Sequence, residues 1–95
     1  MADADLIRRM LDVCDRFEQK RITVSDLQSG ITAHGGALEE MGLDWGKKLD
    51  QLDADLERII FACEANKQYE AALNVIKQLK DYVHKNTGRK NDAKT

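Results

Sequence analysis

The sequence contains no proline, and aromatic residues make up only 5% of its 95 residues. Proline breaks helices and β-sheets favour aromatic and β-branched side chains, so the composition favours helices joined by short turns over a sandwich or barrel. No window approaches the roughly 18 consecutive apolar residues of a membrane-spanning helix, and the N-terminal segment lacks the apolar stretch of a secretory signal peptide. We therefore expect a single cytoplasmic domain with no membrane segment.

Residues arranged for chemistry are also scarce. Cys14 and Cys63 lie far apart on apolar stripes, outside any Cys-x-x-Cys or Cys/His cluster, and are expected to be buried thiols. His34 is expected to pack on the apolar face of its helix and His84 to lie on the surface. The chain has no HExxH, GxSxG or phosphate-loop motif. We expect no enzyme activity, no catalytic residue, no cofactor and no bound metal.

Apolar residues recur at three- and four-residue steps in four segments, as in amphipathic helices. The first segment covers about 4–20, with Asp3 as its expected N-cap. The second begins at Thr23, which forms a capping-box pattern with Asp26. Ile22 and Leu27 occupy the positions of a hydrophobic staple at the same boundary.

The second helix is expected to continue as far as Met41, but it contains Gly30, Gly35 and Gly36. Each glycine costs roughly 1 kcal/mol relative to alanine inside a helix. These glycines therefore predict either close packing of a neighbouring helix or a break at 35–36. Gly42 is the expected C-cap.

The third helix is expected to start after Asp44 as N-cap. Its apolar stripe has the clearest periodicity in the chain and comprises Trp45, Leu49, Leu52, Leu56, Ile59 and Cys63. A short turn at 66–68 then leads to a fourth helix, which is expected to fade at 86–88. Together these segments predict an all-α fold, an antiparallel up-down-up-down four-helix bundle over 1–88, followed by a disordered basic C-terminal tail at 89–95.

Charge is unevenly distributed along the chain. The net charge is −2, but residues 39–64 carry three basic and eight acidic side chains, whereas residues 65–95 carry seven basic and three acidic ones. Asp50, Asp53 and Glu57 follow at i, i+3 and i+7, which places them along one side of the third helix. The residues expected to bind a partner are Glu39, Glu40, Asp44, Trp45, Asp50, Asp53 and Glu57. Two plainer interpretations stay open, namely a solvated helix face and a core position for Trp45.

Residues 11–27, LDVCDRFEQKRITVSDL, resemble the first hairpin of small all-helical bacterial toxin-immunity proteins. These include the colicin D immunity type and the immunity proteins of contact-dependent growth-inhibition systems, in which a pattern ending I-T-x-x-x-[FL] joins helix one to helix two. The acid-rich helix from Leu49 to Glu64 also fits that style, whereas the glycines at 30–36 depart from it. The resemblance implies a small cytoplasmic protein that binds one cognate toxin domain, often a nuclease, and blocks its active site.

An acidic helix face is suited to a nuclease, because carboxylates can stand in for phosphates in a basic cleft and steer association. We expect a monomer or weak dimer without direct nucleic-acid contact. One alternative is a non-catalytic helical adaptor or assembly module, because residues 65–73 are similar to the start of a tetratricopeptide repeat. A second is a small nucleic-acid-associated regulator that uses Lys77, Lys80 and Lys85.

Overall fold

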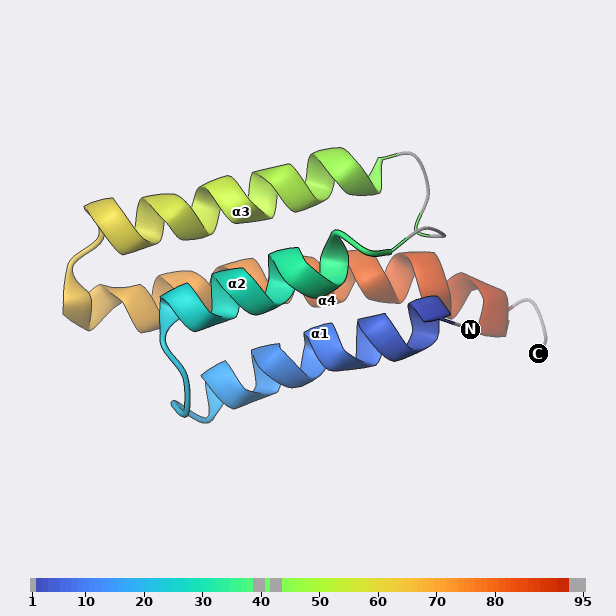
Figure 1. Cartoon of the computed structure of the whole chain (residues 1–95), viewed down its shortest axis with the longest axis horizontal. Helices are drawn as coiled ribbons and strands as arrows, with labels where there is room; N and C mark the ends of the chain where they lie inside the picture. Colours follow the sequence, from blue (N-terminus) through green and yellow to red (C-terminus); the bar gives the residue numbers. More distant parts are fainter. Residues whose placement is uncertain (1, 39–40, 42–43, 93–95) are drawn as a thin grey trace.

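The computed structural model contains four helices that alternate in direction (Figure 1). It describes the backbone at residues 2–38, 41 and 44–92, and the side chains at 4–38, 41 and 44–86. The helices are α1 (Ala2–Glu18), α2 (Val24–Gly35), α3 (Trp45–Ala62) and α4 (Ala65–Asp92). The chain begins at the same end of the bundle at which α4 finishes. The predicted all-α, four-helix bundle is confirmed.

The core is formed by the apolar stripes of all four helices, as their spacing predicts. In α3, Trp45 and Leu52 are buried together with Leu56 and Ile59. Cys14 is buried as expected, but Cys63 at the end of α3 is only half-buried. The largest side chains with almost no exposed surface are Met10, Leu27, Ile31, Leu52, Leu56, Ile76 and Leu79.

The turn between α1 and α2 follows the predicted boundary. The Oγ1 atom of Thr23 accepts a hydrogen bond of 3.1 Å from the backbone N–H of Asp26, whose carboxylate accepts one of 3.1 Å from the backbone N–H of Thr23. This reciprocal pair is the predicted capping box. Before it, Lys20 has a left-handed φ of 62°, and bonds from Lys20 N to Phe17 O and from Arg21 N to Arg16 O close the end of α1.

The predicted starts of α1 and α4 are wrong. Asp3 is not the N-cap of α1, because the helix already includes Ala2. No turn occurs at 66–68, because α4 starts at Ala65 and its first turn is closed by a bond from Gln68 N to Glu64 O. Alanine is the strongest helix former, so a helix can begin before Asn66 without a longer connection.

The second helix ends at the glycine pair, which is one of the two outcomes left open by the sequence. It terminates at Gly35, and the N–H of Gly36 bonds to the carbonyl of Thr32 at 2.9 Å. Leu38 and Met41 are buried although neither lies in α2. They therefore pack on the bundle from the connection between α2 and α3. Gly42, the expected C-cap, lies outside the described residues.

The fourth helix is longer than the sequence predicts. It passes the expected end at 86–88 and continues to Asp92, so its backbone is helical for four residues of the segment predicted to be a disordered tail. The one glycine in this stretch, Gly88, costs roughly 1 kcal/mol in a helix interior, which is not enough to force an end there. Residues 93–95 lie outside the described residues.

Candidate protein-binding face

The helices α2 and α3 lie side by side and antiparallel, which brings the start of α2 next to the end of α3 (Figure 1). Gln28 in α2 reaches across to α3. Its Nε2 atom donates a hydrogen bond of 3.0 Å to Oδ1 of Asp53 and one of 2.8 Å to Oε1 of Glu57. An amide nitrogen carries two hydrogens, so one side chain can hold both carboxylates at once.

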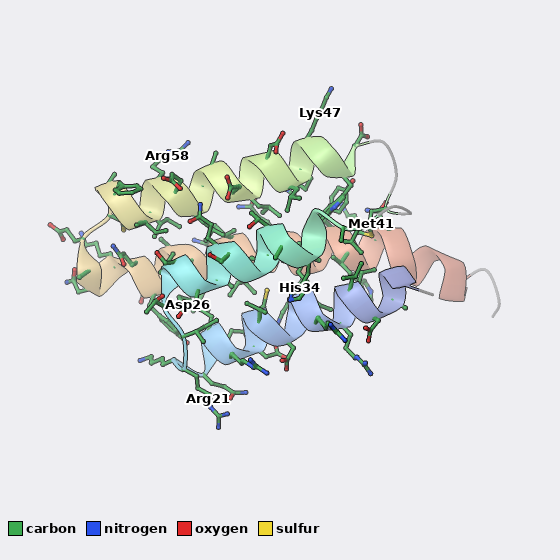
Figure 2. The ribbon with its side chains drawn as sticks, viewed as in Figure 1. Arg21, Asp26, His34, Met41, Lys47 and Arg58 are labelled. Carbon is green, nitrogen blue, oxygen red and sulfur yellow. The ribbon has the colours of Figure 1, made fainter. Side chains whose placement is uncertain are left out.

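Asp50, Asp53 and Glu57 form the acidic face that the i, i+3, i+7 spacing predicts. Asp50 and Glu57 are exposed, and Asp53 is half-buried where α2 covers it. Lys47 lies three residues before Asp50 and about 60° from it around α3, and Lys48 and Arg58 lie farther round the helix. Lys47 and Arg58 point away from α2 (Figure 2), and Arg58 lies 3.4 Å from the carboxylate of Asp55. Asp53 and Glu57, which Gln28 bonds, lie on the side of α3 that adjoins α2.

The predicted partner-binding residue Asp44 does not join this face. Asp44 is exposed at the N-cap of α3 without a side-chain capping bond, and it lies about 120° around the helix from Asp50. Glu39 and Glu40 lie outside the described residues. The structure thus brings together three of the seven predicted residues.

Trp45 is a core residue in this structure. Only 4% of its surface is exposed, and its Nε1 atom donates a hydrogen bond of 2.8 Å to the carbonyl oxygen of Gly35. Its ring lies 5.6 Å from the ring of Tyr82 in α4. A buried indole with a satisfied N–H has no free surface for a partner, so the expected partner-binding role of Trp45 is not supported. The core position that the sequence also allowed is the one observed.

The three lysines of the nucleic-acid alternative are divided between two grooves. Lys77 and Lys80 line an open groove of about 490 Å³ between α1 and α4, whereas Lys85 lines another groove, next to Lys48 of α3. Lys80 is also paired within the chain. Its Nζ lies 2.9 Å from Glu18 and 3.3 Å from Asp15, and hydrogen bonding to Glu18 is the main reason that the pKa of Lys80 is raised. The three lysines therefore form no continuous basic patch.

Sequence analysis did not single out Phe61, in the last turn of α3. It is 78% exposed and is the one large apolar side chain that is exposed within the described part of the chain. The sequence does contain a signal for it, because Phe61 is a large apolar residue that does not lie on the apolar stripe of α3. A helical wheel places it about 120° from the nearest residue of that stripe, Leu49, and on the same line as Asp50 and Glu57.

Metal-ligating side chains do not gather at this face. Among residues 4–38, 41 and 44–86, no group of three His, Cys, Asp or Glu side chains is arranged to hold a metal ion. Within the same described ranges, no helix has both the length and the apolar character needed to cross a bilayer. The acidic face thus presents carboxylates and an amide, which are groups that recognise basic surfaces.

The fold and this face define a four-helix bundle that presents carboxylates along its α2–α3 side. The chain matches no protein-family model, no curated protein and no solved structure.

Proposed function

We propose that this protein is an immunity protein that binds a cognate bacterial toxin, a nuclease, and covers its active site with the acidic face. The bridge from Gln28 to Asp53 and Glu57 is the observation that carries the proposal. The resemblance of residues 11–27 to immunity-protein hairpins supplies the class of partner. The protein itself performs no chemistry in this proposal, since its task is to occupy a site on another protein.

The electrostatics of the acidic face suit a nuclease partner. A nuclease binds phosphates in a basic cleft, and carboxylates spaced along a helix can take the place of those phosphates. Asp50 and Glu57 are exposed and open to such a contact. Attraction between opposite charges speeds encounter, which matters when a toxin must be captured before it acts.

The Gln28 bridge also favours tight binding. Ordering a flexible charged side chain at an interface costs about 0.5–1.5 kcal/mol, and less is lost when the side chain is already held in place. Gln28 fixes Asp53 and Glu57 before any partner arrives. It also reduces the repulsion between two carboxylates four residues apart on one helix.

The nucleic-acid alternative has less support from the geometry. A phosphate backbone is bound by several cations that act together, but Lys80 already pairs with Glu18 and Asp15, and Lys85 lines a different groove. The adaptor alternative rests on a single repeat-like segment at the start of α4, whereas stacked repeats need about three units.

The test starts from the genes that flank this one in its source genome. Each neighbouring product with a basic C-terminal domain is expressed in cells with and without this protein, and growth is measured. Binding of the purified pair is then titrated at low and high salt. We expect the protein to restore growth and to bind with an affinity that falls as salt rises.

Two matched variants assign the binding to the acidic face. Glu57→Lys reverses a charge on the face, whereas Glu70→Lys makes the same change at an exposed position on α4. We expect Glu57→Lys to weaken binding at least tenfold and Glu70→Lys to leave it within about twofold. Equal effects of the two variants, or no flanking product that is neutralised and bound, would contradict the proposal.

A further inference from the structure

Phe61 is an exposed aromatic side chain that the fold of the chain does not need. It lies in the last turn of α3 with 78% of its surface open to solvent. Burying a phenylalanine side chain is favourable, and that free energy is unused in the isolated chain. The other large apolar side chains in the described part of the chain are buried or half-buried.

The position of Phe61 continues the acidic face. Asp50, Ala54, Glu57 and Phe61 follow at steps of four, three and four residues, so they form one stripe along the outer side of α3. From Asp50 to Phe61 this stripe is about 16 Å long. Carboxylates therefore lie along the stripe and an aromatic ring lies at its end.

The charges next to Phe61 indicate what can cover it. In a twofold contact that sets the α3 helices of two copies parallel at Phe61, the Glu57 carboxylates of the two copies would lie close together and repel each other. The nearest basic side chain on α3, Arg58, lies 3.4 Å from the carboxylate of Asp55. A surface with cations around an apolar pocket would match both the ring and the carboxylates.

We propose that Phe61 is the anchor of the partner interface and inserts into an apolar pocket rimmed by basic residues on a protein partner. The inference rests on the proposed function, because it extends the acidic face of that proposal into a complete docking surface. Interfaces concentrate their binding energy in a few desolvated side chains, with aromatic residues enriched among them. Charged residues around such an anchor set the rate and specificity of association.

The first experiment uses a photoreactive probe at the site itself. Phe61 is replaced by the photo-cross-linking analogue p-benzoylphenylalanine, and the variant is irradiated in its source cells. A matched control carries the analogue at Asn74, an exposed position on α4. We expect one cross-linked product that is specific to position 61, with a protein partner that contains a basic domain. A product of twice the chain mass, equal labelling at both positions, or no product at position 61 would overturn the proposal.

The second experiment measures the energetic role of the ring with the purified cross-linked partner. We expect Phe61→Ala to weaken binding about thirty-fold, the effect of a hot-spot residue, while its urea midpoint stays that of the wild type. A decrease in affinity of less than twofold would contradict the anchoring role of Phe61. Glu57→Lys separates the two proposals. If Glu57→Lys weakens binding and Phe61→Ala does not, the acidic face contributes to binding but Phe61 is not its anchor. If Phe61→Ala weakens binding and Glu57→Lys does not, Phe61 is the anchor and the proposed role of the acidic face is wrong.

Discussion

The indole Nε1 atom of Trp45 and the carbonyl oxygen of Gly35 are joined by a hydrogen bond of 2.8 Å. Gly35 is the last residue of α2 and Trp45 is the first of α3, so this bond joins the end of α2 directly to the start of α3. A Cβ atom at Gly35 would lie 3.0 Å from Cζ2 of Trp45 and 3.0 Å from Cδ1 of Leu49. The glycine therefore lets the indole lie against the end of α2.

The first prediction concerns the Trp45 bond. Trp45→Phe keeps an aromatic ring in the core but removes the N–H donor and part of the ring volume. We expect the free energy of unfolding to fall by about 1–3 kcal/mol, from the lost bond and the space left around the smaller ring. Urea unfolding followed by circular dichroism at 222 nm measures this, since the variant lacks the only tryptophan for fluorescence. An unchanged midpoint would mean that the bond contributes nothing to stability.

The second prediction contrasts two helical glycines. A Cβ atom at Gly30 would lie 2.7 Å from Cγ1 of Val13, whereas one at Gly46 would meet no atom within 4 Å. We expect Gly30→Ala to lower the free energy of unfolding by about 1–3 kcal/mol, because the stiff valine must shift and α1 with it. Gly46→Ala should raise it by about 0.5–1 kcal/mol, because alanine loses less entropy on folding.

A double-mutant cycle identifies the contact responsible. Val13→Ala removes both of the atoms closest to a Cβ at Gly30. The combination of Gly30→Ala with Val13→Ala should therefore be more stable than the sum of the two single effects predicts. Strict additivity in urea unfolding would show that the close approach of α1 and α2 at this point is not what requires the glycine.

The third prediction separates the two cysteines. Burial raises the pKa of the Cys14 thiol to about 12, so almost no reactive thiolate exists at pH 8. Cys63 is half-buried at the end of α3. We expect a thiol reagent such as DTNB to modify one cysteine per folded chain at pH 8 and both in denaturant. With Cys63→Ser, the folded chain should not react, and rapid labelling of that variant would contradict the burial of Cys14.

Much of the fold follows from local pattern. The capping box at Thr23 and Asp26 and the apolar stripe of α3 are set by neighbours in sequence, so their positions could be predicted. The end of α2 was harder, because glycines can permit either close packing or a break. Gly30 packs against Val13 of α1, whereas Gly35 ends the helix under Trp45. Only the tertiary partners distinguish the two cases.

The candidate site was predictable in part for the same reason. Helical spacing is enough to place Asp50, Asp53 and Glu57 on one side of α3, but the bridge from Gln28 depends on how α2 packs, 25 and 29 residues away in sequence. The same limit applied to Trp45, because a tryptophan beside an acidic stretch is compatible with either a surface or a core position. The carbonyl of Gly35 that satisfies its N–H becomes visible only in three dimensions.

The fourth prediction is a pH dependence centred on Lys80. Its pKa is raised above the ordinary 10.5, first by the hydrogen bond to Glu18 and also by Asp15, while burial opposes the shift. A group whose pKa is higher in the folded state stabilises the fold fully below its unfolded pKa, and this contribution disappears as pH rises through the folded pKa. The ion pairs should therefore be fully effective at pH 7–9 and be lost as the pH rises through the raised pKa, above 10.5.

Lys80→Met, with Lys85→Met as the matched control, tests that dependence. Because 39% of the Lys80 side chain is exposed, we expect the variant to lose less than about 1 kcal/mol at pH 8. Urea midpoints at pH 8 and pH 11.5 measure the difference from wild type, which should narrow at the higher pH for Lys80→Met and stay constant for Lys85→Met. A difference equally large at both pH values would show that the methionine change acts through packing of the lysine stem, because the contribution of the lysine charge falls as the pH rises through the raised pKa.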